Sequence, residues 1–183
     1  KKGDIANGTI TAIDESPLSE GILYVGTDDG LVWITKDNCE TWTKISENLP
    51  EGYKIYSIDA SAFSEGRAYV AMNGYYSDNF EPLIFKTEDF GKTWISISSN
   101  LPMECVNKIL EDPKNEKILY VGTDNGLYIS VDAGISYSKA NKTLPYVAVH
   151  DIIVHPREND LLVATHGRSI YKVNVKELQK RVK

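Results

Sequence analysis

The chain repeats itself, and this repeat constrains the fold more than any other feature of its 183 residues. The segment from Ile22 to Leu31 returns almost unchanged from Ile118 to Leu127, and looser copies begin at Arg67 and at Asp160. Self-similarity at intervals of this length is typical of folds built from successive similar units. We therefore expect one supersecondary unit, used several times along the chain.

An eight-residue motif follows each of the first three copies, with the pattern Ser/Thr-x-Asp-x-Gly-x-Thr/Ser-Trp/Tyr. An aspartate in a tight turn accepts hydrogen bonds from backbone N–H groups, and glycine permits a positive φ, so the motif predicts a structural turn. The first motif has Cys39 in place of glycine, which predicts local strain. The motif residues are Asp37 and Trp42, then Asp89, Gly91 and Trp94, then Asp132, Gly134 and Tyr137.

Each unit contains four short runs rich in β-branched and aromatic residues, separated by turn residues. This is the pattern of a four-stranded blade in a β-propeller, so we predict an all-β protein. The blades are expected at residues 10–50, 53–102, 106–145 and 149–175, as one segment, with a tail at 176–183. The last blade has only three strands.

About three and three-quarter blades do not close comfortably, since propellers usually have four to eight blades. We expect part of a larger propeller. The alternative is a small four-bladed ring in which Lys1 to Thr9 supplies the missing outer strand. A partial ring exposes apolar inter-blade faces, so its expected partners are the remaining blades of the parent propeller or a second copy of the chain.

The motif resembles the Asp box of BNR-repeat proteins. The stretch from Gly8 to Val173, including Ala164 to Tyr171, is similar to part of large bacterial sortilin-like BNR-repeat proteins of the glycosyl hydrolase type. This resemblance implies propeller blades with structural Asp boxes. It also implies a secreted, periplasmic or cell-surface location, and it says little about activity.

Ligand-binding residues are expected on the face that carries the loops between the second and third strands and the connections between blades. Blade two has a long insertion there, residues 73–82, whose tyrosines could stack on sugar rings or on a peptide, or could simply pack against the next blade. Turn formation alone also accounts for the aspartates in the hairpins. The candidates are Tyr75, Tyr76, Asp78, Asp28, Asp124, His166 and Arg168.

No catalytic constellation stands out in the sequence. A glycosidase needs two carboxylates about 5 to 10 Å apart, one with a raised pKa, and no such pair is marked. A sialidase clamp of three arginines is disfavoured, because only Arg168 is expected on the ligand face. The histidines lack metal-ligand spacing, so neither a metal nor a cofactor is predicted.

Two functions remain open. The first is a non-catalytic binding or scaffold propeller that recognises protein, peptide or glycan. The alternative is a segment of a polysaccharide glycoside hydrolase whose catalytic acids lie partly outside this chain. The net charge of −6 argues against nucleic acid, and the sequence has no apolar run long enough for membrane insertion.

Two further expectations follow from the strand directions. Trp42, Trp94 and Tyr137 should occupy equivalent buried positions between blades. Cys39 and Cys105 should lie at opposite ends of strands about 17 to 20 Å long, too far apart for a disulfide.

Overall fold

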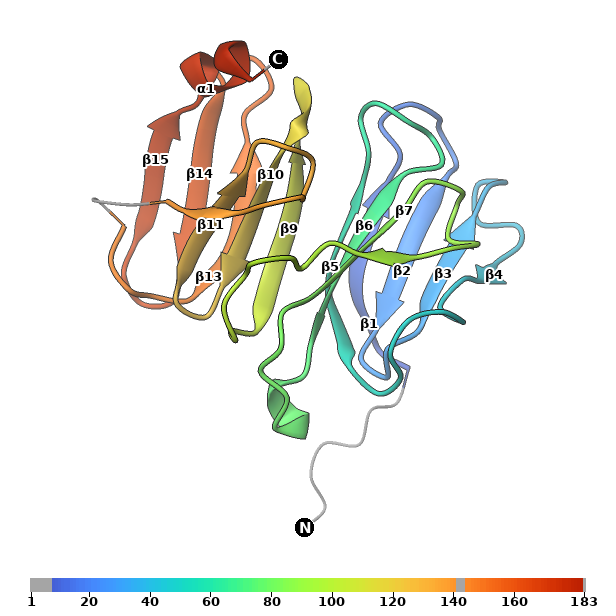
Figure 1. Ribbon diagram of the computed structural model, residues 1–183. Helices are drawn as coiled ribbons and strands as arrows, with labels where there is room; N and C mark the ends of the chain where they lie inside the picture. Colours follow the sequence, from blue (N-terminus) through green and yellow to red (C-terminus); the bar gives the residue numbers. More distant parts are fainter. Residues whose placement is uncertain (1–7, 141–143, 183) are drawn as a thin grey trace.

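The computed structural model describes residues 8–140 and 144–182 and is all-β, as predicted, with its sheets standing side by side (Figure 1). Blade one has the strand order β1 (Ile10–Glu15), β2 (Leu23–Thr27), β3 (Val32–Thr35) and β4 (Thr43–Lys44). Blade two has β5 (Lys54–Ala60), β6 (Ala68–Asn73), β7 (Leu83–Thr87) and β8 (Ile95–Ser96). A short 3-10 helix, η1 (Tyr75–Ser77), lies between β6 and β7.

Blade three comprises β9 (Val106–Asp112), β10 (Asn115–Thr123), β11 (Gly126–Ser130) and β12 (Ser138–Lys139). The fourth sheet has only β13 (Val149–Val154), β14 (Asp160–Thr165) and β15 (Ile170–Asn174) within the described chain. All neighbouring strands are antiparallel. The four consecutive propeller-type sheets are therefore confirmed.

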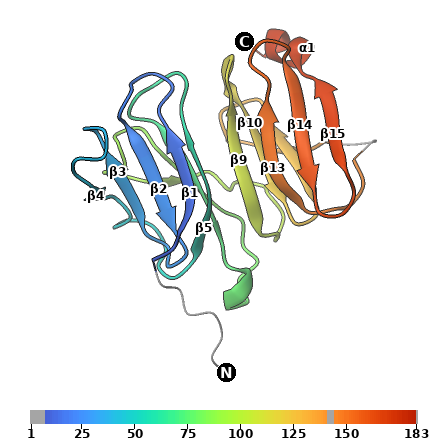
Figure 2. The same cartoon turned by 180° about the vertical axis from the view of Figure 1, so that it is seen from behind.

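The first strands of the four sheets lie next to one another, with β5 between β1 and β9, and β9 between β5 and β13 (Figures 1 and 2). All four have the same irregularity near their start, where the pairing shifts after Ile10, Ile55, Val106 and Val149. The four sheets together form a wedge. The first strands line its inner side, and the short fourth strands form its outer rim. The alternative that uses Lys1 to Thr9 as an outer strand concerns mostly residues 1–7, which are outside the described part.

Matched positions on the first strands show how the blades pack. Ile58, Ile109 and Ile152 each pair with a valine of the second strand and are 4%, 0% and 1% exposed. Ile13 pairs with Val25 in the same way but is 62% exposed. The later three isoleucines pack against a preceding blade, and Ile13 has no preceding blade within the described residues. Blade one therefore presents an uncovered inter-blade face.

The C-terminal residues, expected as a tail, form a helix, α1 (Lys176–Arg181). Gln179 donates to both carboxylate oxygens of Asp112 at 3.0 and 2.9 Å, and Asn115 donates to the carbonyl of Val182 at 2.9 Å. These contacts hold α1 against the turn between β9 and β10. Within the described chain, no helix is long and apolar enough to cross a membrane.

Candidate functional site

The three repeated motifs, called Asp boxes below after the motif that they resemble, form the same hydrogen-bond network in equivalent turns between the third and fourth strands. In blade two, Asp89 accepts from the backbone N–H and the hydroxyl of Thr93 at 2.9 and 2.8 Å, and from the hydroxyl of Thr87 at 2.8 Å. Asp37 and Asp132 have the corresponding partners. These carboxylates are fully engaged in closing their own turns, which supports a structural role.

The backbone of each box passes through the left-handed region at two successive residues. Gly91 has φ 79° and Gly134 has φ 90°, while Cys39 adopts φ 71° at the equivalent position. A side chain in this region costs energy that glycine avoids. The predicted strain at Cys39 is therefore present. Cys39 and Cys105 are both free thiols, as predicted. Cys39 is exposed and Cys105 is buried.

The aromatic residues of the boxes are not all buried. Trp94 and Tyr137 are 8% and 5% exposed, and the ring N–H of Trp94 donates to the carbonyl of Ile45 in blade one at 2.7 Å. Trp42 is 39% exposed, so the prediction of three equivalent buried rings is wrong for this residue. The physical reason is that the rings of Trp94 and Tyr137 pack on the preceding blade, and blade one has no preceding blade within the described residues.

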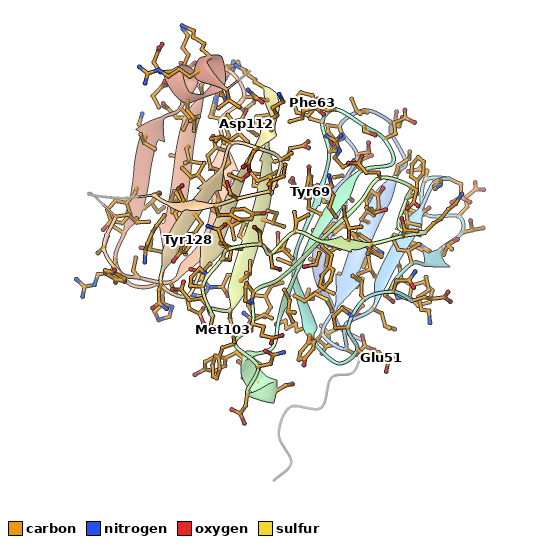
Figure 3. The ribbon with its side chains drawn as sticks, in the orientation of Figure 1. Glu51, Phe63, Tyr69, Met103, Asp112 and Tyr128 are labelled. Atoms are coloured by element: carbon orange, nitrogen blue, oxygen red, sulfur yellow. The ribbon has the colours of Figure 1, made fainter. Side chains whose placement is uncertain are left out.

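Aromatic side chains gather at the end of the wedge opposite the Asp boxes. η1 projects there from blade two, on the same side as the labelled Met103 and Glu51, whereas Phe63 lies at the other end (Figure 3). Tyr75 and Tyr76 are 55% and 82% exposed. Tyr75 contacts Tyr76 and Phe80 edge to face, with ring centroids 5.7 and 6.0 Å apart. We call Tyr75, Tyr76 and Phe80 the aromatic cluster.

Hydrogen bonds hold the insertion at both of its ends. The side-chain oxygen of Asn73 accepts from the backbone N–H of Tyr75 at 3.0 Å, and the amide of Asn79 donates to the hydroxyl of Tyr53 at 3.0 Å. Asp78 ends η1 in the left-handed conformation, with φ 54°. The loop is thus anchored at both ends while its rings remain exposed.

Tyr146, which the sequence reasoning missed, is 82% exposed and lies in the connection from blade three to β13. The ammonium group of Lys139 lies 3.9 Å from its ring centroid. The available signal was a tyrosine directly after the Leu-Pro pair that ends the third unit, as such a pair ends the first two. Phe80 was missed as an individual residue, although it lies in the predicted insertion.

The two aspartates predicted in hairpin turns accept hydrogen bonds from residues of their own blades. Asp28 accepts from the backbone N–H of Thr9 at 2.8 Å, and Asp124 accepts from the amide of Asn107 at 2.9 Å. His166 and Arg168 are exposed in the turn between β14 and β15, and the His166 ring lies 5.4 Å from that of His150. The seven candidates are thus spread over the turns of all four blades.

Two aspartates with raised pKa values lie elsewhere, near the ends of β1 and β5. Burial raises the pKa of Asp14, and it raises that of Asp59 well above its ordinary value. Asp14 accepts from the backbone N–H of Ala60, and Asp59 from that of Glu111, both at 2.7 Å. Each carboxyl therefore links its blade to the next one. No group of three or more acidic, histidine or cysteine residues within 8–140 and 144–182 is placed to hold a metal ion.

Known proteins similar to this chain include carbohydrate-active enzymes. It is 29% identical over 152 residues to a xyloglucanase of Hypocrea jecorina, a match that covers 73% of this chain and 18% of the enzyme. It is 28% identical over 126 residues to vacuolar protein sorting/targeting protein 10 of Laccaria bicolor, covering 63% of this chain and 8% of that protein. The chain thus spans less than a fifth of these relatives. No family model matches the sequence.

Solved structures share the fold at lower identity. The GH74 xyloglucanase from Xanthomonas campestris matches with a TM-score of 0.73 and 17% identity, over 92% of this chain and 29% of the enzyme. YCF48 bound to the D1 peptide matches with a TM-score of 0.63 and 15% identity, over 92% of this chain and 55% of that chain. In both cases the wedge corresponds to part of a longer protein.

Proposed function

We propose that this chain is a segment of a larger β-propeller that binds a glycan through the face carrying the aromatic cluster, without hydrolysing it on its own. The observation that carries the proposal is the exposure of Tyr75 and Tyr76 on an insertion anchored at both ends. The similarity to xyloglucanases supports a polysaccharide of the β-glucan type as the ligand class.

The chemistry of the cluster suits carbohydrate. The apolar faces of sugar rings pack on aromatic side chains, and rings held edge to face present both a flat surface and an edge. Asp78, beside the rings, adds a carboxylate able to accept sugar hydroxyls. Asp28, Asp124, His166 and Arg168 would extend the contact along the same face.

The alternative is that the segment belongs to a polysaccharide glycoside hydrolase, as the names of the relatives suggest. In that case, its loop face would form part of a substrate cleft whose catalytic acids lie partly elsewhere. The raised pKa values of Asp14 and Asp59 favour no such role, because both carboxyls accept backbone N–H groups of the next blade.

We further propose that other propeller blades, or a second copy, cover the uncovered face of blade one. Ile10, Ile13 and Trp42 on this face are 61%, 62% and 39% exposed. The equivalent residues of blade two, Ile55, Ile58 and Trp94, are all buried against blade one. A secreted, periplasmic or cell-surface location would fit a polysaccharide ligand.

The test is to titrate xyloglucan oligosaccharides into the 183-residue chain by calorimetry, with reducing-sugar release assayed in parallel. We expect binding without release. Tyr76→Ala should weaken binding about tenfold, the effect of losing one stacked ring. Phe63→Ala is the matched control, because Phe63 is exposed at the opposite end. Release of reducing sugar would contradict the proposal that the chain binds without hydrolysis. Equal effects of the two substitutions would contradict the assignment of glycan binding to the face with the aromatic cluster.

A further inference from the structure

The fourth sheet lacks the outer strand that the other three possess. In blades one to three, the third strand pairs with a two-residue outer strand through Ile34 and Thr43, Lys86 and Ile95, and Ile129 and Ser138. The equivalent residue of β15 is Lys172, which pairs with Leu162 of β14. On its other side, β15 has no strand partner within the described chain. One edge of blade four is therefore open.

An apolar pocket of about 590 Å³ lies beside this edge, between blades three and four. Its volume falls within the range of about 300 to 1,000 Å³ found for ligand pockets. Leu178 of α1 is among its lining residues. Its other principal lining residues are Leu127, Ala140, Leu144, Leu161, Val163 and Tyr171.

The same location is filled between the earlier blades. Trp94 lies in one buried cluster with Val32, Ile45 and Leu49 of blade one and Val70 of its own blade. The equivalent residues around the pocket are Leu127, Ala140 and Leu144 of blade three and Val163 of blade four. Tyr137 lies in a second cluster whose members include Ile97, Leu101 and Val121. Each cluster contains the aromatic ring that comes just before an outer strand. Between blades three and four, the pocket lies where the equivalent ring would insert. Among the described residues, no aromatic side chain that precedes an outer strand fills it.

We propose that an extended strand carrying a tryptophan adds to the β15 edge and inserts its ring into this pocket. The occupant is a segment outside residues 8–182 with the pattern of the chain's own outer strands, Thr-Trp-x-x-Ile, as at 41–45 and 93–97. Its ring N–H would donate to the carbonyl of Ala140, as that of Trp94 donates to Ile45.

The backbone chemistry of the edge fits this occupant. Ile45 donates its N–H to the carbonyl of Val32 at 2.9 Å, and Ile97 donates to that of Ile84 at 3.0 Å. The corresponding residue in β15 is Ile170, whose carbonyl would accept from the added strand. An exposed sheet edge supplies the main-chain affinity, and the side-chain pocket supplies the selectivity.

Lys1 to Thr9 fits this role poorly, because it contains no aromatic residue. α1 lines the pocket as a helix rather than as an added strand, so it leaves the edge open. A second copy of the chain is the competing occupant, and the test distinguishes it.

The probe is a fluorescein-labelled peptide with the sequence of residues 91–101, GKTWISISSNL, added to the 183-residue chain and followed by fluorescence anisotropy. We expect binding with a dissociation constant of about 1 mM or tighter. The control peptide has alanine in place of its tryptophan and should bind at least about tenfold more weakly, since it buries no large ring.

A matched pair of variants tests the edge. Lys172→Pro removes an N–H on the outer side of β15, where proline is tolerated, and should abolish binding. Lys172→Ala loses the same ion pair with Asp160 but keeps the N–H and should bind as the unchanged chain does. Circular dichroism checks that both variants fold, and the peptide comparison stands without them.

Three outcomes overturn the proposal. They are the absence of binding at about 1 mM, equal binding of the two peptides, and a dimer in sedimentation velocity that excludes the peptide. The last result would identify a second copy as the occupant. None of these outcomes depends on whether the aromatic cluster binds a glycan.

Discussion

Replacing Trp94 with alanine tests whether the Asp-box rings hold the blades together. The ring is 8% exposed, and its N–H donates to the carbonyl of Ile45 in the preceding blade. Burying an aromatic of about 200 Å² at about 25 cal/mol per Å² is worth about 5 kcal/mol before relaxation. Partial collapse of the cavity offsets some of this loss, so we expect the free energy of unfolding to fall by about 3 to 5 kcal/mol.

Trp42→Ala is the matched control at the equivalent position of blade one. Trp42 is 39% exposed, so less area returns to water, and we expect a loss of about 1 to 2 kcal/mol. Urea unfolding followed by far-ultraviolet circular dichroism measures both variants without relying on tryptophan fluorescence. If Trp42→Ala costs as much as Trp94→Ala, burial between blades is not the source of the stabilisation.

Three further predictions concern the boxes and the thiols. Cys39→Gly should raise the free energy of unfolding by about 1 kcal/mol in urea titrations, because glycine relieves the positive φ; a lower stability would contradict this reasoning. The backbone N–H and the hydroxyl of Thr93 lower the pKa of Asp89. The stability that Asp89 contributes is therefore present above its unfolded-state pKa of about 3.8, and it is lost as the pH falls through the pKa of the folded state. Thermal melts of Asp89→Asn should therefore differ from those of the unchanged chain at pH 7 and converge towards them as the pH falls through the folded value. A gap that does not narrow with acid would refute the linkage. Maleimide should label one thiol of the native chain rapidly, Cys39, because Cys105 is buried and its burial raises its pKa; mass spectrometry showing rapid double labelling would contradict the fold.

The Asp boxes could be predicted in detail because their interactions are local. Asp132 bonds to residues two positions before it and four positions after it, so the sequence motif contains the whole network. Trp42 was misjudged because its burial depends on a blade absent from the described residues. The helix at Lys176–Arg181 was missed because it is only six residues long and is held by contacts with blade three.

The candidate site was predictable only in part. The insertion was visible as extra length with two tyrosines, and the structure leaves both rings exposed. Phe80 and Tyr146 escaped notice because exposure depends on how the turns fold back. The raised pKa of Asp59 could not be foreseen, since it arises from burial between blades.

The most direct test of the account is hydrogen exchange by mass spectrometry on the chain with and without xyloglucan oligosaccharides. Binding at the loop face predicts slower exchange in residues 74–81 and in the hairpin turns at 28–30 and 124–126, with the Asp-box turns at 37–41, 89–93 and 132–136 unchanged. Protection of the Asp-box turns, or no protection under conditions where calorimetry detects binding, would contradict the proposed glycan-binding face.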